Sequence, residues 1–134
     1  MMMTRSNEAV DVVRSYYEMM AAGDTEAITQ LCSDDASAIV IGTDPDEWWE
    51  GGAQIKSAVR QQLESAGLSV RAGDPRVVQT GDVAWFADRP VFVMPDGQEV
   101  ACRLTGVLHR EQGEWKLVHS HASLGVANAE AFGQ

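Results

Sequence analysis

The stretch Gly113-Glu114-Trp115-Lys116-Leu117-Val118-His119-Ser120-His121-Ala122-Ser123 says most about the fold of this chain. It opens with a Gln112-Gly113 turn signal, and the residues that follow are typical of a β-strand. Side chains of a strand alternate between its two faces. A regular alternation would put five of these side chains on one face: Trp115, Leu117, His119, His121 and Ser123.

Further strands are predicted upstream of this stretch. The β-type runs are separated by turn signals, of which Thr80-Gly81-Asp82 and Pro95-Asp96-Gly97 are the clearest. The predicted strands comprise residues 68–72, 76–79, 83–93, 99–109 and 115–124. Because the connections are short, we expect neighbouring strands to be antiparallel and to form a meander.

The first half of the chain has the periodicity of helices. Apolar residues three and four positions apart predict helices over residues 7–22, 24–32 and 53–65, the last closed by Gly67. A short strand over residues 36–41 is predicted between the second and third helices. Since the meander has an apolar face to cover, we expect an α+β fold in which these helices pack on the sheet.

Length and composition predict one globular domain over residues 1–134, with flexible tails at 1–6 and 126–134. Twenty acidic against ten basic residues give a net charge of −10, which argues against binding to nucleic acids or membrane surfaces. The polar start of the chain predicts a cytoplasmic location. Cys32 and Cys102 are too few and too far apart for a disulfide framework, so both are expected to be buried thiols.

Three segments resemble the SnoaL-like branch of the NTF2-like superfamily: Gly42-Thr43-Asp44-Pro45, Gly81-Asp82-Val83-Ala84-Trp85 and the stretch 113–123. The last is also similar to the association domain of calcium/calmodulin-dependent protein kinase II. The resemblance covers about residues 7–125 and implies an NTF2-like (cystatin-like) cone, in which N-terminal helices pack on a strongly curved antiparallel or mixed sheet. It also implies a pocket at the open end and dimerisation through the outer face of the sheet. Its members differ widely in function, so the resemblance does not select an activity.

His119 and His121 are the candidate acid–base pair. Two residues apart on a strand, their imidazoles would lie about 7 Å apart and could orient or protonate a ligand near neutral pH. Alternatively, they form hydrogen bonds across a subunit interface. We expect no metal, because the neighbouring strand offers no carboxylate beside the pair.

Arg103 lies in the middle of an apolar strand, where an unpaired charge is costly to bury. By its resemblance to the pocket arginines of the kinase association domain, it is a candidate to bind a ligand carboxylate. The alternative is a structural salt bridge to Asp88 or Glu99.

Aromatic residues are the other candidate ligand contacts. Trp48 and Trp49 lie in a loop where they would roof a pocket or seal the wide end of the cone. Tyr16, Tyr17 and Trp85 are expected in the core, with a polar tip of one of them reaching the cavity.

The sequence therefore predicts a small-molecule-binding domain with an apolar pocket and no cofactor. The expected ligand is a small apolar or aromatic molecule, with or without a carboxylate. The predicted ligand-binding residues are Tyr17, Trp48, Trp49, Trp85, Arg103, His119 and His121. One alternative is a cyclase, isomerase or dehydratase that uses His119 and His121 as acid and base, although residues 36–41 and 104–108 lack the carboxylates that isomerase-type relatives use.

Another alternative is an oligomerisation domain. The strand over residues 83–93 is apolar on both faces, and the helices cover only one face of the sheet. We therefore expect a homodimer formed sheet against sheet, which includes part of the strand 115–124 and buries roughly 1,200–2,000 Å².

Overall fold

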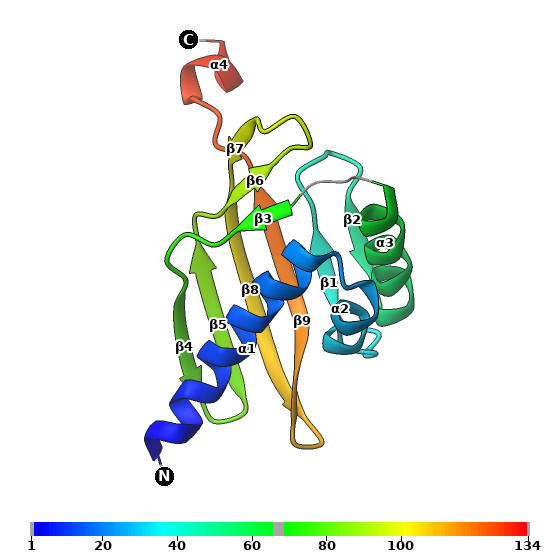
Figure 1. The fold of residues 1–134 in the computed structure, drawn as a ribbon, viewed down its shortest axis with the longest axis vertical. Coiled ribbons are helices and arrows are strands. Elements are labelled where there is room, and N and C mark those ends of the chain that lie inside the picture. The colour runs from blue at the N-terminus through cyan, green and yellow to red at the C-terminus, as the bar shows by residue number, and fades with distance from the viewer. Residues whose placement is uncertain (1, 66–68, 134) are drawn as a thin grey trace.

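The structure, a computed structural model, describes residues 2–65 and 69–133 (Figure 1). The helices are α1 (Met2–Ala22), α2 (Thr25–Leu31), α3 (Gly52–Ser65) and α4 (Asn128–Phe132). The strands are β1 (Ile39–Ile41), β2 (Trp48–Glu50), β3 (Ser69–Arg71), β4 (Arg76–Thr80), β5 (Val83–Asp88), β6 (Val91–Val93), β7 (Glu99–Ala101), β8 (Arg103–Glu111) and β9 (Glu114–Ser123). The predicted Gly67 and Leu68 boundaries lie outside the described residues.

The strands form a six-stranded sheet in the order β2-β1-β9-β8-β5-β4 and a three-stranded sheet in the order β3-β6-β7. Neighbouring strands are antiparallel except for β1 and β9, which run parallel, with Ile39 opposite His119. The large sheet is therefore mixed, and the α+β class predicted from the sequence is confirmed.

The second sheet arises because two of the predicted strands are interrupted. The run 83–93 breaks at Arg89 and Pro90, since proline has no N–H to donate to a sheet. The run 99–109 breaks at Cys102, whose N–H donates to the Pro90 carbonyl at 3.0 Å. As a result β6 and β7 leave the large sheet as a hairpin, in which β6 also pairs with β3.

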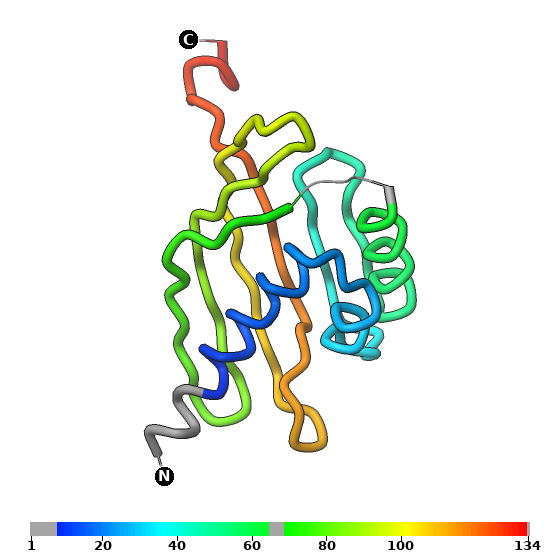
Figure 2. Tube along the Cα trace, in the orientation of Figure 1, coloured from blue at the N-terminus to red at the C-terminus, as the bar shows by residue number. Residues whose placement is uncertain are grey.

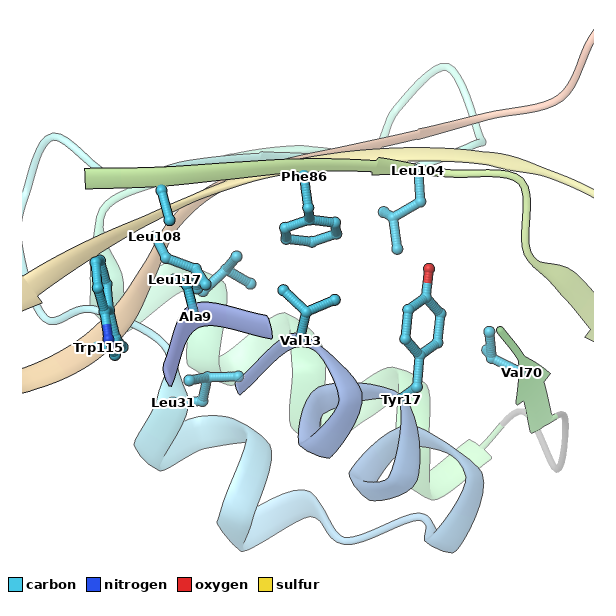
Figure 3. Close-up of a cluster of buried hydrophobic side chains, with 11 residues drawn as sticks. Ala9, Val13, Tyr17, Leu31, Val70, Phe86, Leu104, Leu108, Trp115 and Leu117 are labelled. Carbon is cyan, nitrogen blue, oxygen red and sulfur yellow. The ribbon is translucent and has the colours of Figure 1, made fainter. Parts of the chain in front are cut away.

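Helices α1, α2 and α3 cover one face of the large sheet, which we call the inner face (Figure 1). Figure 3 shows Val13 and Tyr17 of α1 pointing toward Phe86 and Leu104 on the sheet. Val13 and Phe86 are almost completely buried. Gly106 lies opposite Phe86, and a Cβ at Gly106 would overlap the phenylalanine ring. This close packing fixes α1 on the sheet.

The strand β9 contains a β-bulge that the sequence pattern did not reveal. Leu117 pairs with Leu108 and His119 with Val107, so Val118 is an extra residue on β9. The bulge reverses the alternation, and the expectation of one shared face is wrong. Trp115 and Leu117 point to the inner face, in the buried core cluster (Figure 3). The face of the sheet away from the helices, which we call the outer face, carries His119, His121 and Ser123.

The chain ends and cysteines complete the fold. The short helix α4 has no buried residue and extends away from the sheets (Figure 1). Flexibility of the predicted tails stays a prediction, and residues 1 and 134 of those tails lie outside the described residues. Cys32 and Cys102 are free and buried, as predicted. Among the described residues, no helix is both long and apolar enough to cross a membrane.

Candidate functional site

A cavity of about 520 Å³ lies between the helices and the two sheets. Its lining is mostly apolar, and its residues come from α1, α2, α3, both sheets and the segment that joins β1 to β2. They are Tyr16, Met20, Ile28, Gly42, Thr43, Glu47, Val59, Gln62, Leu63, Val70, Phe92, Met94, Val100, Ala122 and Leu124.

The break at Pro90 and Cys102 positions one wall of this cavity. The small sheet supplies Val70, Phe92 and Val100 from β3, β6 and β7. The apolar stripe of α3 supplies Val59 and Leu63 on another wall. The small sheet therefore stands across from the helices and leaves a hollow where a continuous sheet would have packed against them.

Tyr16 brings a polar group to this apolar lining. Burial, and to a smaller extent the neighbouring Cys32 thiol, raises the pKa of the Tyr16 hydroxyl well above its usual range. The hydroxyl is therefore neutral near neutral pH. Among the described residues it has no hydrogen-bond partner, so it is available to donate to, or accept from, a bound molecule.

The loop between β1 and β2 borders the cavity with Gly42, Thr43 and Glu47; because Thr43 is exposed and Glu47 half-buried, we call this edge the mouth of the cavity. Its Glu47 carboxylate accepts from the Asp44 N–H at 2.9 Å and from the side-chain amide of Gln62 on α3. Figure 2 shows this loop at the same end of the molecule as the C-terminal end of α3. The backbone at Gly42 closely approaches the Glu47 side chain, and a Cβ there would collide with it. Glu47 therefore ties the loop to α3.

Tyr17 belongs to the core, as predicted, and its hydroxyl is already occupied. It donates to Asp88 Oδ2 at 2.6 Å. The Asp88 carboxylate also accepts from the backbone N–H groups of Gly73, Asp74 and Arg89. Burial raises the pKa of Asp88, but these hydrogen bonds outweigh burial and leave it below its usual range. Asp88 thus joins α1, the segment after β3 and the end of β5.

The histidines lie on the outer face, away from the cavity. His119 Nδ1 donates to the Ile39 carbonyl of β1 at 2.9 Å. His121 is exposed and lies opposite Thr105 on β8. Neither histidine lines the cavity. The exposure of His121 leaves it able to contact a second molecule on this face, whereas His119 is half-buried.

Arg103 is also on the outer face, where its Nε donates to Ser123 Oγ at 3.2 Å. The predicted salt bridge is wrong, because Glu99 pairs with Arg71 and Asp88 is held by Tyr17 and by backbone N–H groups. Arg103 does not reach the cavity lining.

Trp48 and Trp49, which were predicted in a loop, lie in the strand β2. Trp48 is 57% exposed, and its Nε1 donates to Glu50 at 3.0 Å. Trp49 packs against the buried cluster that contains Ile28 and Ile55. Trp85 is 46% exposed on the outer face, so its predicted place in the core is wrong.

None of the predicted ligand-binding residues therefore lines the cavity. Whether they contact a ligand elsewhere stays a prediction. Several lining residues were recognisable only as core positions on helical stripes, namely Met20, Ile28, Val59 and Leu63. Nothing in the local sequence of Glu47 marked it as a cavity residue.

The sequence model of the SnoaL-like domain matches residues 10–127. None of the curated proteins compared with the chain matches it.

Solved structures similar to the chain have NTF2-like folds. An NTF2-like protein of unknown function from Pseudomonas putida has a TM-score of 0.84 at 15% identity, covering 96% of this chain and 92% of its own. A candidate dehydratase of the NTF2-like family from Streptomyces avermitilis has a TM-score of 0.80 at 19% identity, covering 95% and 100%. A candidate calcium/calmodulin-dependent protein kinase II association domain from Thiobacillus denitrificans has a TM-score of 0.67 at 21% identity, covering 83% and 90%. These similarities confirm the predicted fold. At sequence identities this low, they do not show that the chain shares the activity of any of these proteins.

Proposed function

Since this chain belongs to the SnoaL-like domain family, we propose that it binds an apolar small molecule in the cavity between its helices and sheets. The observation that supports this proposal is the cavity itself, whose volume of about 520 Å³ lies within the range of small-molecule sites. Its apolar walls favour an apolar body, and the free hydroxyl of Tyr16 offers an orienting hydrogen bond.

A catalytic role for the histidines finds no support in this arrangement. An acid–base pair must lie within hydrogen-bond reach of the substrate. His119 and His121 lie on the outer face, across the sheet from the cavity. We therefore favour binding over catalysis.

Binding in the cavity is tested with Nile red, a neutral dye that fluoresces in apolar sites. Ala122 lines the cavity, so Ala122→Phe fills part of it and should weaken dye binding by at least about tenfold. Ala101 is exposed and does not line the cavity, so Ala101→Phe is the matched control and should bind as the wild type does. Absence of dye binding by the wild type, or equal binding by both variants, contradicts the proposal.

We propose homodimerisation through the outer face as a second function. The exposed apolar side chains on this face include Val78, Val83 and Trp85, with exposed fractions of 47%, 36% and 46%. A sheet face of this kind is typical of an interaction surface. His121 and Arg103 would then lie in or beside the interface.

Light scattering at micromolar concentration tests the dimer. We expect a mass near twice the 14.5 kDa of one chain, and we expect Trp85→Glu to return it to one chain mass. A wild-type mass that stays at 14.5 kDa as the protein is concentrated contradicts the dimer.

A further inference from the structure

We infer that the cavity selects apolar molecules that end in an amine over those that end in a carboxylate, and that Glu47 at the mouth sets this preference. The inference rests on the proposed function, because it concerns the ligand class of the same cavity.

The first observation is the sign of the charge in the lining. Glu47 is the carboxylate among the described lining residues, and neither lysine nor arginine occurs among them. Of the cations near the lining in sequence, Arg71 pairs with Glu99 and Lys56 with Asp34, and Arg60, next to Val59, is exposed and outside the lining. Arg103, which was expected to bind a ligand carboxylate, lies on the other face of the sheet. An anionic ligand would therefore find no cationic partner in the described lining.

The second observation is that Glu47 is held in place. Its two carboxylate oxygens accept from Asp44 and Gln62, and its stem packs over Gly42. A carboxylate oxygen accepts more than one hydrogen bond, so both oxygens keep room for a further donor. A fixed, half-buried carboxylate needs little rearrangement to receive an ammonium group.

These observations predict the order of affinities. A ligand carboxylate would lose its hydration beside apolar walls and would face the like charge of Glu47, and both effects oppose binding. An amine is protonated near neutral pH, so its ammonium group would pair with Glu47 at the mouth while its apolar body fills the cavity. An alcohol has neither the attraction nor the repulsion and should bind with intermediate affinity.

Three probes with one ring system separate the possibilities: naphthylmethylamine, naphthylmethanol and naphthoic acid, substituted at the same ring position. Calorimetric titration of the wild type near neutral pH should give about tenfold tighter binding of the amine than of the acid. Glu47→Gln should bring the two within about threefold of each other. Asp46→Asn removes a charge from the same loop outside the lining, so it should keep the tenfold gap.

The outcomes distinguish this inference from the proposed function. If the acid binds as tightly as the amine, or if the gap survives in Glu47→Gln, the inference is overturned while cavity binding stands. If none of the three probes binds, the proposed function fails. The ratio of the amine's affinity to the acid's affinity is measured on the wild type. It therefore decides the charge preference even if Glu47→Gln does not fold.

Discussion

The two faces of the six-stranded sheet differ in what they expose. On the inner face, Phe86 and Leu108 are buried under α1, and the region beside the small sheet is hollow. On the outer face, Trp85 is half exposed, and His121 and Arg103 point to solvent. Adjacent residues of one strand therefore have opposite environments, as Trp85 and Phe86 show.

This difference separates the candidate functions in space. The cavity supports binding of a small molecule, whereas the outer face supports contact with another protein chain. The bulge at Val118 assigns the two histidines to the outer face. The sequence stretch that best predicts the fold thus contributes Ala122 to the cavity and its histidines to the opposite surface.

Deletion of Ser120 should have the largest effect, because it shortens β9 by one residue beyond the bulge. The side chains that follow would turn to the other face, so His121 would lie opposite Gly106 on the core side, where the Phe86 ring packs closely. We expect the free energy of unfolding to fall by more than about 5 kcal/mol, enough to unfold the domain. Circular dichroism should show no cooperative thermal transition. Deletion of Ala127, in the exposed C-terminal segment, is the control and should melt as the wild type does. A folded Ser120 deletion contradicts this account of β9.

Replacement of each neighbouring aromatic residue compares the two faces directly. Phe86 is 2% exposed, so Phe86→Ala should lower the free energy of unfolding by about 3–5 kcal/mol. Trp85→Ala should lower it by about 1 kcal/mol or less at a low protein concentration that keeps the chain monomeric. Urea unfolding measures both values. Similar losses for the two variants would contradict the assignment of faces.

Asp88→Asn should give a smaller, pH-dependent effect on the inner face. The pKa of the Asp88 carboxyl is lowered in the folded chain. Its stabilisation is therefore fully present above its unfolded pKa of about 3.9 and is lost as pH falls through the folded pKa. The variant should be less stable than the wild type by about 2–3 kcal/mol near neutral pH, and the gap should narrow below about pH 4. Urea unfolding as a function of pH measures the gap, and a gap that stays constant into acid would contradict the role of the carboxylate.

Much of the fold was predictable from the sequence because its signals are local. The apolar stripes predicted α1, α2 and α3, and the turn signals separated β4, β5, β8 and β9. The strand β2 was missed, because Trp48-Trp49-Glu50 is too short to show alternation and forms its hydrogen bonds with β1.

The candidate site was less predictable because it depends on departures from regular patterns. The bulge at Val118 reversed the face of the histidines, and proline at position 90 was the available sign that the run 83–93 breaks. Apolar residues such as Val59 and Leu63 look alike in sequence whether they fill a core or line a hollow. The two environments are distinguished by the three-dimensional fold, in which the small sheet separates from the large sheet and leaves the cavity between them.

Methyl NMR during titration with naphthylmethanol shows residue by residue whether an apolar molecule binds on the inner face. We expect concentration-dependent shifts for the cavity methyl groups of Val59, Leu63 and Ala122. The methyl groups of Val83 and Val107 on the outer face should not shift. Shifts confined to the outer-face methyl groups, with the cavity methyl groups unchanged, would contradict binding on the inner face.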